Sequence, residues 1–152
     1  MTTPTLLDEV AIEFFVPGDP APQGSKKAMP IRNRATGKII KINQVESSAK
    51  VGPWRERVAI AAHQAMSGRA LFDGPLSVVL NFVLPRPKSA PKRSTPPATK
   101  RPDLDKLERA VLDALTGVCF SDDSHVVSLI GHKRIAEIGE TAGVHIGLEV
   151  EQ

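Results

Sequence analysis

Hydrophobic and polar residues repeat along the chain with two different periods, which predict strands and helices. In the last segment, apolar residues at positions 144, 146, 148 and 150 alternate with polar or small ones, as in a half-exposed antiparallel strand. Elsewhere, runs of β-branched and aromatic residues between turn formers predict further strands. The expected strands are residues 10–16, 39–42 (a short one), 76–84, 126–135 and 143–150.

Two segments carry apolar residues at helical spacing instead. The first runs from Pro53, which suits a first helical turn, to Met66, and Ser67-Gly68 ends it. Its expected buried stripe is Trp54, Val58, Ala61, Ala62 and Ala65. The second covers residues 104–115 and stops at Thr116-Gly117, with the expected stripe Leu104, Leu107, Val111, Ala114 and Leu115.

These elements predict an α+β fold in which two main helices pack on a mixed, largely antiparallel sheet. The 152 residues suit a single domain covering positions 1–152. No apolar run is long enough for a membrane helix, and Met1 to Glu9 lack the basic and apolar regions of a signal peptide. The lone Cys119 is expected as a small buried hydrophobe, which fits a reducing, cytoplasmic location.

Charge becomes informative when its position is considered, since the net charge of +3 is only mildly basic. Residues 85–101 contain six Lys or Arg, five Pro and no acid, so we expect a loop without a packed element. Two interpretations stand: a solvated surface loop, or a mobile basic arm that follows DNA phosphates. Its place directly before an acidic cluster favours DNA contact. A second loop is expected over residues 20–27, which contain turn formers and two lysines.

Two short acidic segments are the candidates for chemistry. Asp103 and Asp105 lie where the basic loop meets the second helix, and Asp122 and Asp123 lie between that helix and the next strand. Each pair has a structural alternative. Asp103 or Asp105 could cap the helix, with Asp105 and Glu108 forming a capping box, and Asp122-Asp123 could be turn residues.

If three or four of these carboxylates converge, their repulsion is costly unless a cation is bound or their pKa values are raised. Carboxylate oxygens are preferred ligands of Mg²⁺, which also keeps water and phosphate as ligands. Such a site is suited to phosphodiester hydrolysis. Arg109 lies one turn after Asp105 and could stabilise charge on the leaving oxygen, or form a ladder of surface ion pairs with Asp105 and Asp113. The four scattered histidines indicate no zinc site.

The ordered set of these residues resembles the RusA family of Holliday-junction resolvases. The matching pieces are Asp103-Leu-Asp105-Lys-Leu, Ala110-Val-Leu-Asp113-Ala-Leu115, Asp122-Asp123-Ser-His-Val126-Val127 and Lys133. The likeness is strongest over residues 101–135 and continues more loosely through the loop that starts at Pro20 and the last strand.

The resemblance implies a RusA-like fold, a homodimer, and Mg²⁺- or Mn²⁺-dependent paired nicks across four-way branched DNA in recombination and repair. It also implies that loop 117–121 folds over to bring the second acidic pair beside the first. The implied catalytic residues are Asp103, Asp105, Asp123, Asp122 and Arg109, the four aspartates being metal ligands. Arg109 stands at the family's lysine position, where it keeps the charge but loses the ready deprotonation of lysine. Lys106 stands where other members carry asparagine.

The expected DNA contacts are Lys26, Lys88, Lys92, Arg93, Lys100, Arg101, Lys106 and Lys133. Two other functions fit the same residues: a non-catalytic protein of this fold that holds branched DNA, and a metal-dependent nuclease for flaps or RNA. Many members of the family come from phages and prophages, and a phage origin fits this chain.

Overall fold

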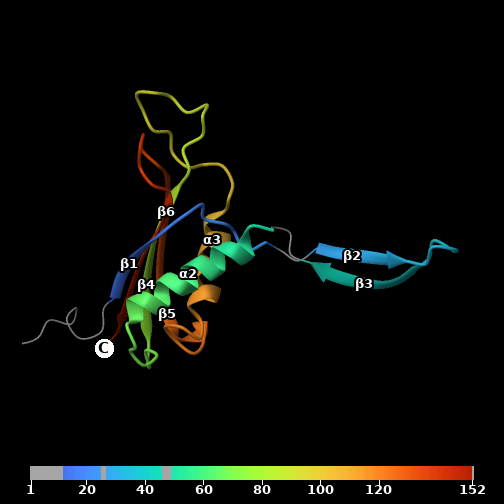
Figure 1. Cartoon of the computed structure of the whole chain (residues 1–152), viewed down its shortest axis with the longest axis horizontal. Helices are drawn as coiled ribbons and strands as arrows, with labels where there is room; N and C mark the ends of the chain where they lie inside the picture. The colour runs from blue at the N-terminus through green and yellow to red at the C-terminus, as the bar shows by residue number, and fades with distance from the viewer. Residues whose placement is uncertain (1–11, 25–26, 46–48, 152) are drawn as a thin grey trace, which may run out of the picture.

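The main sheet of the protein has four strands in the order β1-β6-β4-β5 (Figure 1). The computed structural model describes residues 12–24, 27–45 and 49–151. The strands of this sheet are β1 (Ile12–Pro17), β4 (Leu76–Leu84), β5 (Val126–Ile135) and β6 (Gly143–Val150). Strand β6 is antiparallel to both of its neighbours, and β4 and β5 are parallel. The sheet is therefore mixed and largely antiparallel, as the sequence predicts.

Two helices pack on one face of this sheet. Helix α2 spans Val51–Met66, and helix α3 spans Leu104–Leu115. Helix α3 connects the parallel strands β4 and β5, and a short 3₁₀ turn, η1 (Asp123–His125), follows it. The bounds of α3, β4, β5 and β6 match the sequence prediction. Helix α2 begins two residues earlier than expected, with Pro53 inside its first turn.

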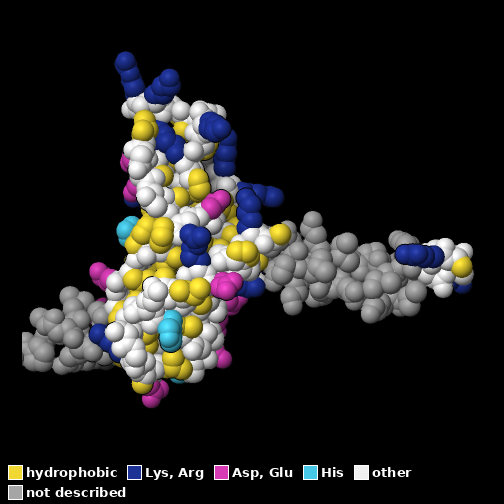
Figure 2. Space-filling view, in the orientation of Figure 1, with side chains coloured by type: hydrophobic (Ala, Val, Ile, Leu, Met, Phe, Trp, Pro, Cys, Tyr) yellow, Lys and Arg dark blue, Asp and Glu magenta, His cyan; other side chains and the backbone are white. Residues whose placement is uncertain are grey.

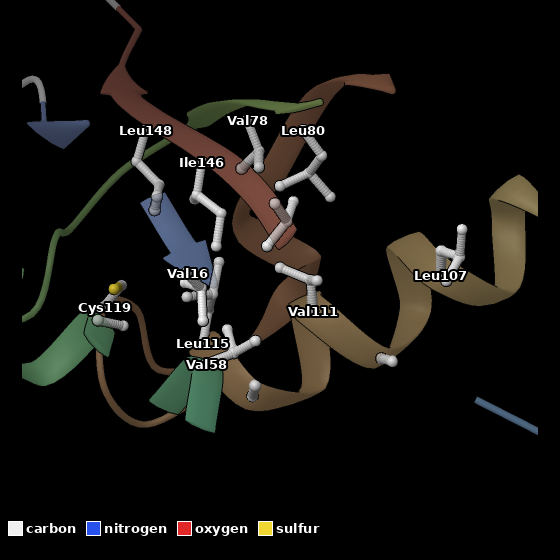
Figure 3. Packing of buried hydrophobic residues seen from close by; sticks show 14 of the residues in the cluster. Val16, Val58, Val78, Leu80, Leu107, Val111, Leu115, Cys119, Ile146 and Leu148 are labelled. Carbon is white, nitrogen blue, oxygen red and sulfur yellow. The ribbon is translucent and has the colours of Figure 1, made fainter. Parts of the chain in front are cut away.

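The core lies between the helices and the sheet (Figure 3). Alternate residues of β4 face it, so Val78 and Leu80 are fully buried, whereas Val79 between them lies on the opposite face and is only partly buried. The helices contribute their predicted stripes, with Ala61, Ala65 and Leu104 only partly buried. Cys119 is buried as expected, and this burial raises the pKa of its thiol to about 11.

A separate two-stranded ribbon corrects the sequence prediction. Strand β2 (Lys27–Arg32) pairs with the antiparallel strand β3 (Ile39–Val45), and Figure 1 shows the ribbon projecting from the rest of the protein. The sequence indicated only a short strand at 39–42 and placed Lys27 in a loop. β2 contains a proline and a charge at each end, so its pattern alone is weak. Pairing with the more regular β3 stabilises it.

Candidate active site at the start of helix α3

The first acidic pair lies at the exposed start of α3. Asp103 is the N-cap residue, but its side chain makes no capping hydrogen bond. Asp105 is already the second helical residue, so the alternative of a capping box between Asp105 and Glu108 does not hold. The Asp103 side chain is 56% exposed, and its Oδ2 lies 3.9 Å from Nζ of Lys106. Neither carboxylate is thus used to cap the helix, and the positive end of α3 faces both.

A groove of about 460 Å³ opens beside Asp103. One wall is the loop that contains Pro20 to Gly24, fixed to the helix by a 2.9 Å hydrogen bond from the Gln23 amide to the Lys106 carbonyl. The other residues that line the groove are Asp19, Lys50, Arg101, Pro102, Asp103 and Lys106. Three of them are cations, so the groove combines the exposed Asp103 carboxylate with the charge needed to attract a phosphate.

Two residues of β5, Lys133 and Gly131, contact the region around the start of α3. The Lys133 ammonium on β5 donates 2.8 Å hydrogen bonds to the carbonyls of Lys100 and Pro102. This lysine, predicted as a DNA contact, therefore has a positioning role in the chain. Two residues earlier in β5, a methyl group on Gly131 would overlap the Glu108 carboxylate, so this glycine allows Glu108 to lie flat on the strand.

Glu108 is a candidate that sequence reasoning missed. It lies one turn after Asp105 and is partly buried, and its pKa is raised by desolvation first and by the Asp105 charge second. The sequence did contain a signal, because a glycine in the interior of a strand, here Gly131, indicates close approach of another group. That signal alone did not identify the partner.

The second acidic pair lies at the other end of α3. Asp122 accepts a 2.8 Å hydrogen bond from the Ser124 amide, which lowers the pKa of Asp122 and confirms the turn interpretation for this residue. The pKa of Asp123 is raised, by desolvation first and then by the adjacent Asp122 and by the charge of Asp113. Asp123 thus lies close to two other carboxylates, and in the described part of the chain it forms no ion pair.

The alternative interpretation of Arg109, a ladder of ion pairs along α3, is not seen among the described residues. Asp113 pairs with Arg55 of α2, at 3.9 Å between Oδ2 and Nη1. Within the described ranges, Arg109 makes no ion pair. It is exposed on the side of α3 that also carries Asp105, so its charge remains available to a ligand.

The two acidic pairs do not converge within one chain. Lys133 contacts the segment just before Asp103, whereas β5 begins at Val126, directly after Asp123 and η1. Seven strand residues span about 23 Å, so the pairs lie at opposite ends of α3. In the part of the chain that the structure describes, no group of three His, Cys, Asp or Glu residues is arranged to hold a metal ion. The oxygen donors suit Mg²⁺ or Mn²⁺ in chemistry, but a single chain does not supply the geometry. The expectation that loop 117–121 returns to the start of α3 is therefore wrong. Instead, η1 leads directly into β5 near the C-terminal end of α3.

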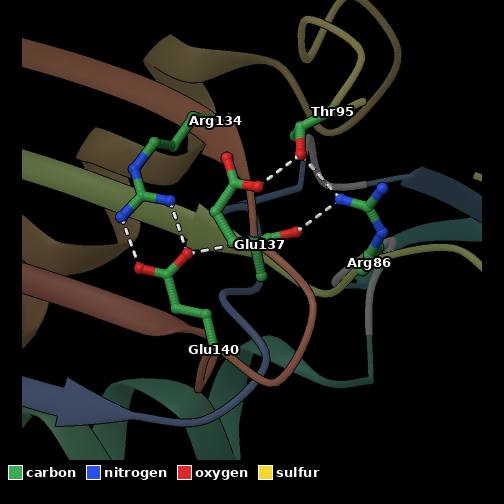
Figure 4. Close-up of polar contacts among 6 residues, drawn as sticks. Arg86, Thr95, Arg134, Glu137 and Glu140 are labelled. Atoms are coloured by element: carbon green, nitrogen blue, oxygen red, sulfur yellow. Dashed lines mark hydrogen bonds and ion pairs between the residues drawn. The ribbon is translucent and has the colours of Figure 1, made fainter. Parts of the chain in front are cut away.

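The basic segment 85–101 is a loop, as predicted, but it is folded around one of its own cations. The Arg86 guanidinium donates a hydrogen bond to Thr95 Oγ1 (Figure 4). It also donates hydrogen bonds to the carbonyls of Pro91, Ser94 and Ala136. Figure 2 shows Lys and Arg side chains gathered over the end of the molecule that this loop forms. The exposed cations are Lys88, Lys92, Arg93, Lys100 and Arg101. Lys26, another predicted contact, lies outside the described residues.

Comparison with known proteins decides the family. The model of the endodeoxyribonuclease RusA family matches residues 17–149, which include both acidic pairs, the groove and the basic loop. The chain belongs to the RusA family. It is also 34% identical over 128 residues to YqaN, an uncharacterized protein of Bacillus subtilis (strain 168), a match that covers 78% of this chain and 83% of YqaN.

Membership of the RusA family implies endodeoxyribonuclease activity in general, and nucleases of this family generally depend on a divalent metal ion. The RusA family also acts on branched DNA. In the described part of this member, no helix is both long and apolar enough to cross a bilayer.

Proposed function

We propose that this chain is a structure-selective DNA endonuclease that resolves four-way junctions with Mg²⁺ or Mn²⁺ as its cofactor. One observation carries the proposal: Asp103, whose side chain makes no capping hydrogen bond at the start of α3, borders a groove lined by three cations, one of which, Arg101, is the last residue of the basic loop. A phosphodiester needs both features, cations that hold its negative charge and carboxylates that hold a metal. Asp103, Asp105, Asp122, Asp123 and Arg109 remain the residues we assign to the reaction.

The metal, when bound, would polarise the scissile phosphate and make hydroxide available near neutral pH. The residues of the chain do the rest. Lys50, Arg101 and Lys106 attract and orient the phosphate in the groove. Arg109 stabilises charge on the leaving oxygen as a fixed cation, because a guanidinium does not give up its proton near neutral pH. Lys133 holds the Asp103 segment in place through its two carbonyl contacts.

A second copy of the chain offers a way to unite the acidic pairs. Strand β5 is at the edge of the main sheet and, among the described strands, pairs only with β4. It exposes Val127, Leu129 and Ile130 at 60%, 39% and 49%. Unpaired edges with apolar side chains are templates for pairing with another chain. Two copies paired antiparallel across β5 would be related by a two-fold axis, which places the start of one β5 beside the end of the other.

In such a dimer, the Asp122-Asp123 pair of one subunit approaches the Asp103–Asp105 segment of its partner. The reason is that Asp122-Asp123 precede β5, whereas the Asp103–Asp105 segment is tied to the end of β5 through Lys133. Each dimer then holds two composite sites related by the two-fold axis, and paired nicks across a symmetric four-way junction require such an arrangement.

The function is tested with a labelled synthetic four-way junction. We expect symmetrical nicks in MgCl₂ or MnCl₂ and none in EDTA. Asp103→Asn should abolish cleavage while leaving junction binding largely intact, and Glu56→Gln, which changes an exposed acid on α2, should cut normally. Cleavage by Asp103→Asn at the wild-type rate would exclude this residue from the site.

The composite site has a separate test by mixing two inactive variants. One carries Asp103→Asn with Asp105→Asn, and the other carries Asp122→Asn with Asp123→Asn. In a mixed dimer both pairs of changes fall in one composite site, which leaves the other site intact. Mixing should restore single nicks. If each chain holds its own site, the mixture stays inactive.

A non-catalytic role in holding branched DNA is the second candidate, and the separation of the acidic pairs in one chain favours it. Junction binding without nicks in either metal, at every ratio of protein to DNA, would establish this alternative. Preferential cutting of flaps or RNA in competition with the junction would instead indicate a different nuclease substrate.

A further inference from the structure

The β2–β3 ribbon has an unusual charge and an unusual position. The segment from Lys27 to Val45 contains five Lys or Arg and no Asp or Glu, in a chain with 17 acidic residues. Its cations are Lys27, Arg32, Arg34, Lys38 and Lys41. Its two strands pair with each other and, among the described strands, with no other. A lone two-stranded ribbon is marginally stable in water, so a ribbon of this kind needs a partner.

The tip of the ribbon is a closed turn with all six residues exposed. The Asn33 side chain accepts hydrogen bonds from the amides of Ala35 and Thr36, at 2.8 and 3.1 Å, and the Asn33 amide donates to the Lys38 carbonyl at 2.7 Å. Gly37 adopts a φ of +71°, which a larger residue would resist. The turn therefore presents Arg34 and Lys38 from a defined backbone.

Described residues on either side of the ribbon border the groove beside Asp103. Gly24, the last described residue before the ribbon, lines the groove, and so does Lys50, which follows it. Along the chain, the ribbon therefore lies between two residues that line this groove.

We propose that the β2–β3 ribbon is a DNA-binding arm that lies in a groove of one duplex of the branched substrate, a proposal that rests on the function proposed above. The major groove of B-DNA, about 12 Å wide, admits a two-stranded ribbon. The absence of acids suits a polyanion, because each phosphate contact releases counterions. A second copy of the ribbon is a poorer occupant, since two arms with five cations each repel one another.

The test compares Arg34→Ala/Lys38→Ala with the wild type by measuring affinity for a four-way junction and a linear duplex in EDTA, over a range of salt concentrations. Losing two phosphate contacts should weaken binding to both DNAs by about tenfold or more and reduce the slope of log affinity against log salt by about 2. Arg69→Ala, which removes an exposed cation just beyond the far end of α2, is the control and should bind as the wild type.

Three results decide the outcome. Wild-type affinity and slope in the double variant, with an unchanged circular dichroism spectrum, would overturn the proposal. A shift to monomer in sedimentation without a change in DNA affinity would also overturn it, in favour of a second copy as partner. Weakened binding with a smaller slope supports the arm even if the wild type makes no nicks, so the failure of the proposed nuclease function can be distinguished from failure of the arm.

Discussion

Removing the Arg86 guanidinium should open the basic loop without unfolding the protein. This side chain donates four hydrogen bonds, three of them within the loop, to Pro91, Ser94 and Thr95, and one to Ala136 beyond β5. A hydrogen bond from a charged donor contributes about 1.5–3 kcal/mol when buried. Arg86 is only partly buried and water can replace it at the carbonyls. We therefore take about 0.5–1 kcal/mol for each bond, or about 2–4 kcal/mol in total.

That energy corresponds to a rise of about 30- to 1,000-fold in the open population of the loop in Arg86→Ala. Limited trypsin digestion measures this rise, since cleavage after an exposed lysine or arginine tracks the open fraction when closing is fast. Cleavage after Lys88, Lys92 and Arg93 should accelerate, and mass spectrometry locates the cuts. The substitution removes no trypsin site of its own, because Pro87 follows Arg86.

Arg86→Lys keeps the charge but cannot reach all four acceptors, so its loop should open to an intermediate extent. Arg69→Ala should be cut in the loop at the wild-type rate. Thermal unfolding of Arg86→Ala should stay a single cooperative transition, since the hydrophobic core does not involve this side chain, and its free energy should fall by no more than the about 2–4 kcal/mol of these bonds. Loop cleavage within twofold of the wild-type rate would refute the argument that Arg86 holds the loop.

Three other predictions concern stability and reactivity. Leu107→Ala should lower the free energy of unfolding by about 2–5 kcal/mol in urea, because the side chain is fully buried, whereas Leu71→Ala, at a position 42% exposed, should have a much smaller effect. Glu140 pairs with Arg134, which lowers the Glu140 pKa to about 2. The stabilisation from this ion pair is therefore complete above about pH 4.5 and is lost as the pH falls toward 2. The difference in free energy of unfolding between the wild type and Glu140→Gln, measured in urea, should then become smaller from pH 5 to pH 3. A difference that stays constant would contradict this pairing. Cys119, with its pKa raised to about 11, should react with a thiol reagent at pH 8 only after denaturant is added; rapid reaction of the native protein would show that the thiol is accessible.

The sequence by itself determined most of the secondary structure and the α+β class. Strand β6 and helix α3 have strong periodic patterns, because alternate side chains of a strand and one stripe of a helix must be buried. The acidic segments and the basic loop were also recognisable, since charge that cannot be buried must remain on the surface. The ribbon was only half predicted, because β2 obtains its conformation from pairing with β3 and its local pattern is weak.

The tertiary structure decided which of these side chains meet. Helix α3 runs opposite to β5, so the segment before the helix lies beside the end of the strand, and Asp122-Asp123 lie about a helix length away from Asp103. The spacing of residues along the chain does not predict the direction of α3 relative to β5, because that direction depends on how β4 and β5 pair. The same holds for Arg86, which looks like any other loop cation until its acceptors fold around it, and for Glu108, whose carboxylate is partly buried only because Gly131 leaves room on β5. Contacts between distant segments are set by packing, and packing depends on the whole chain at once.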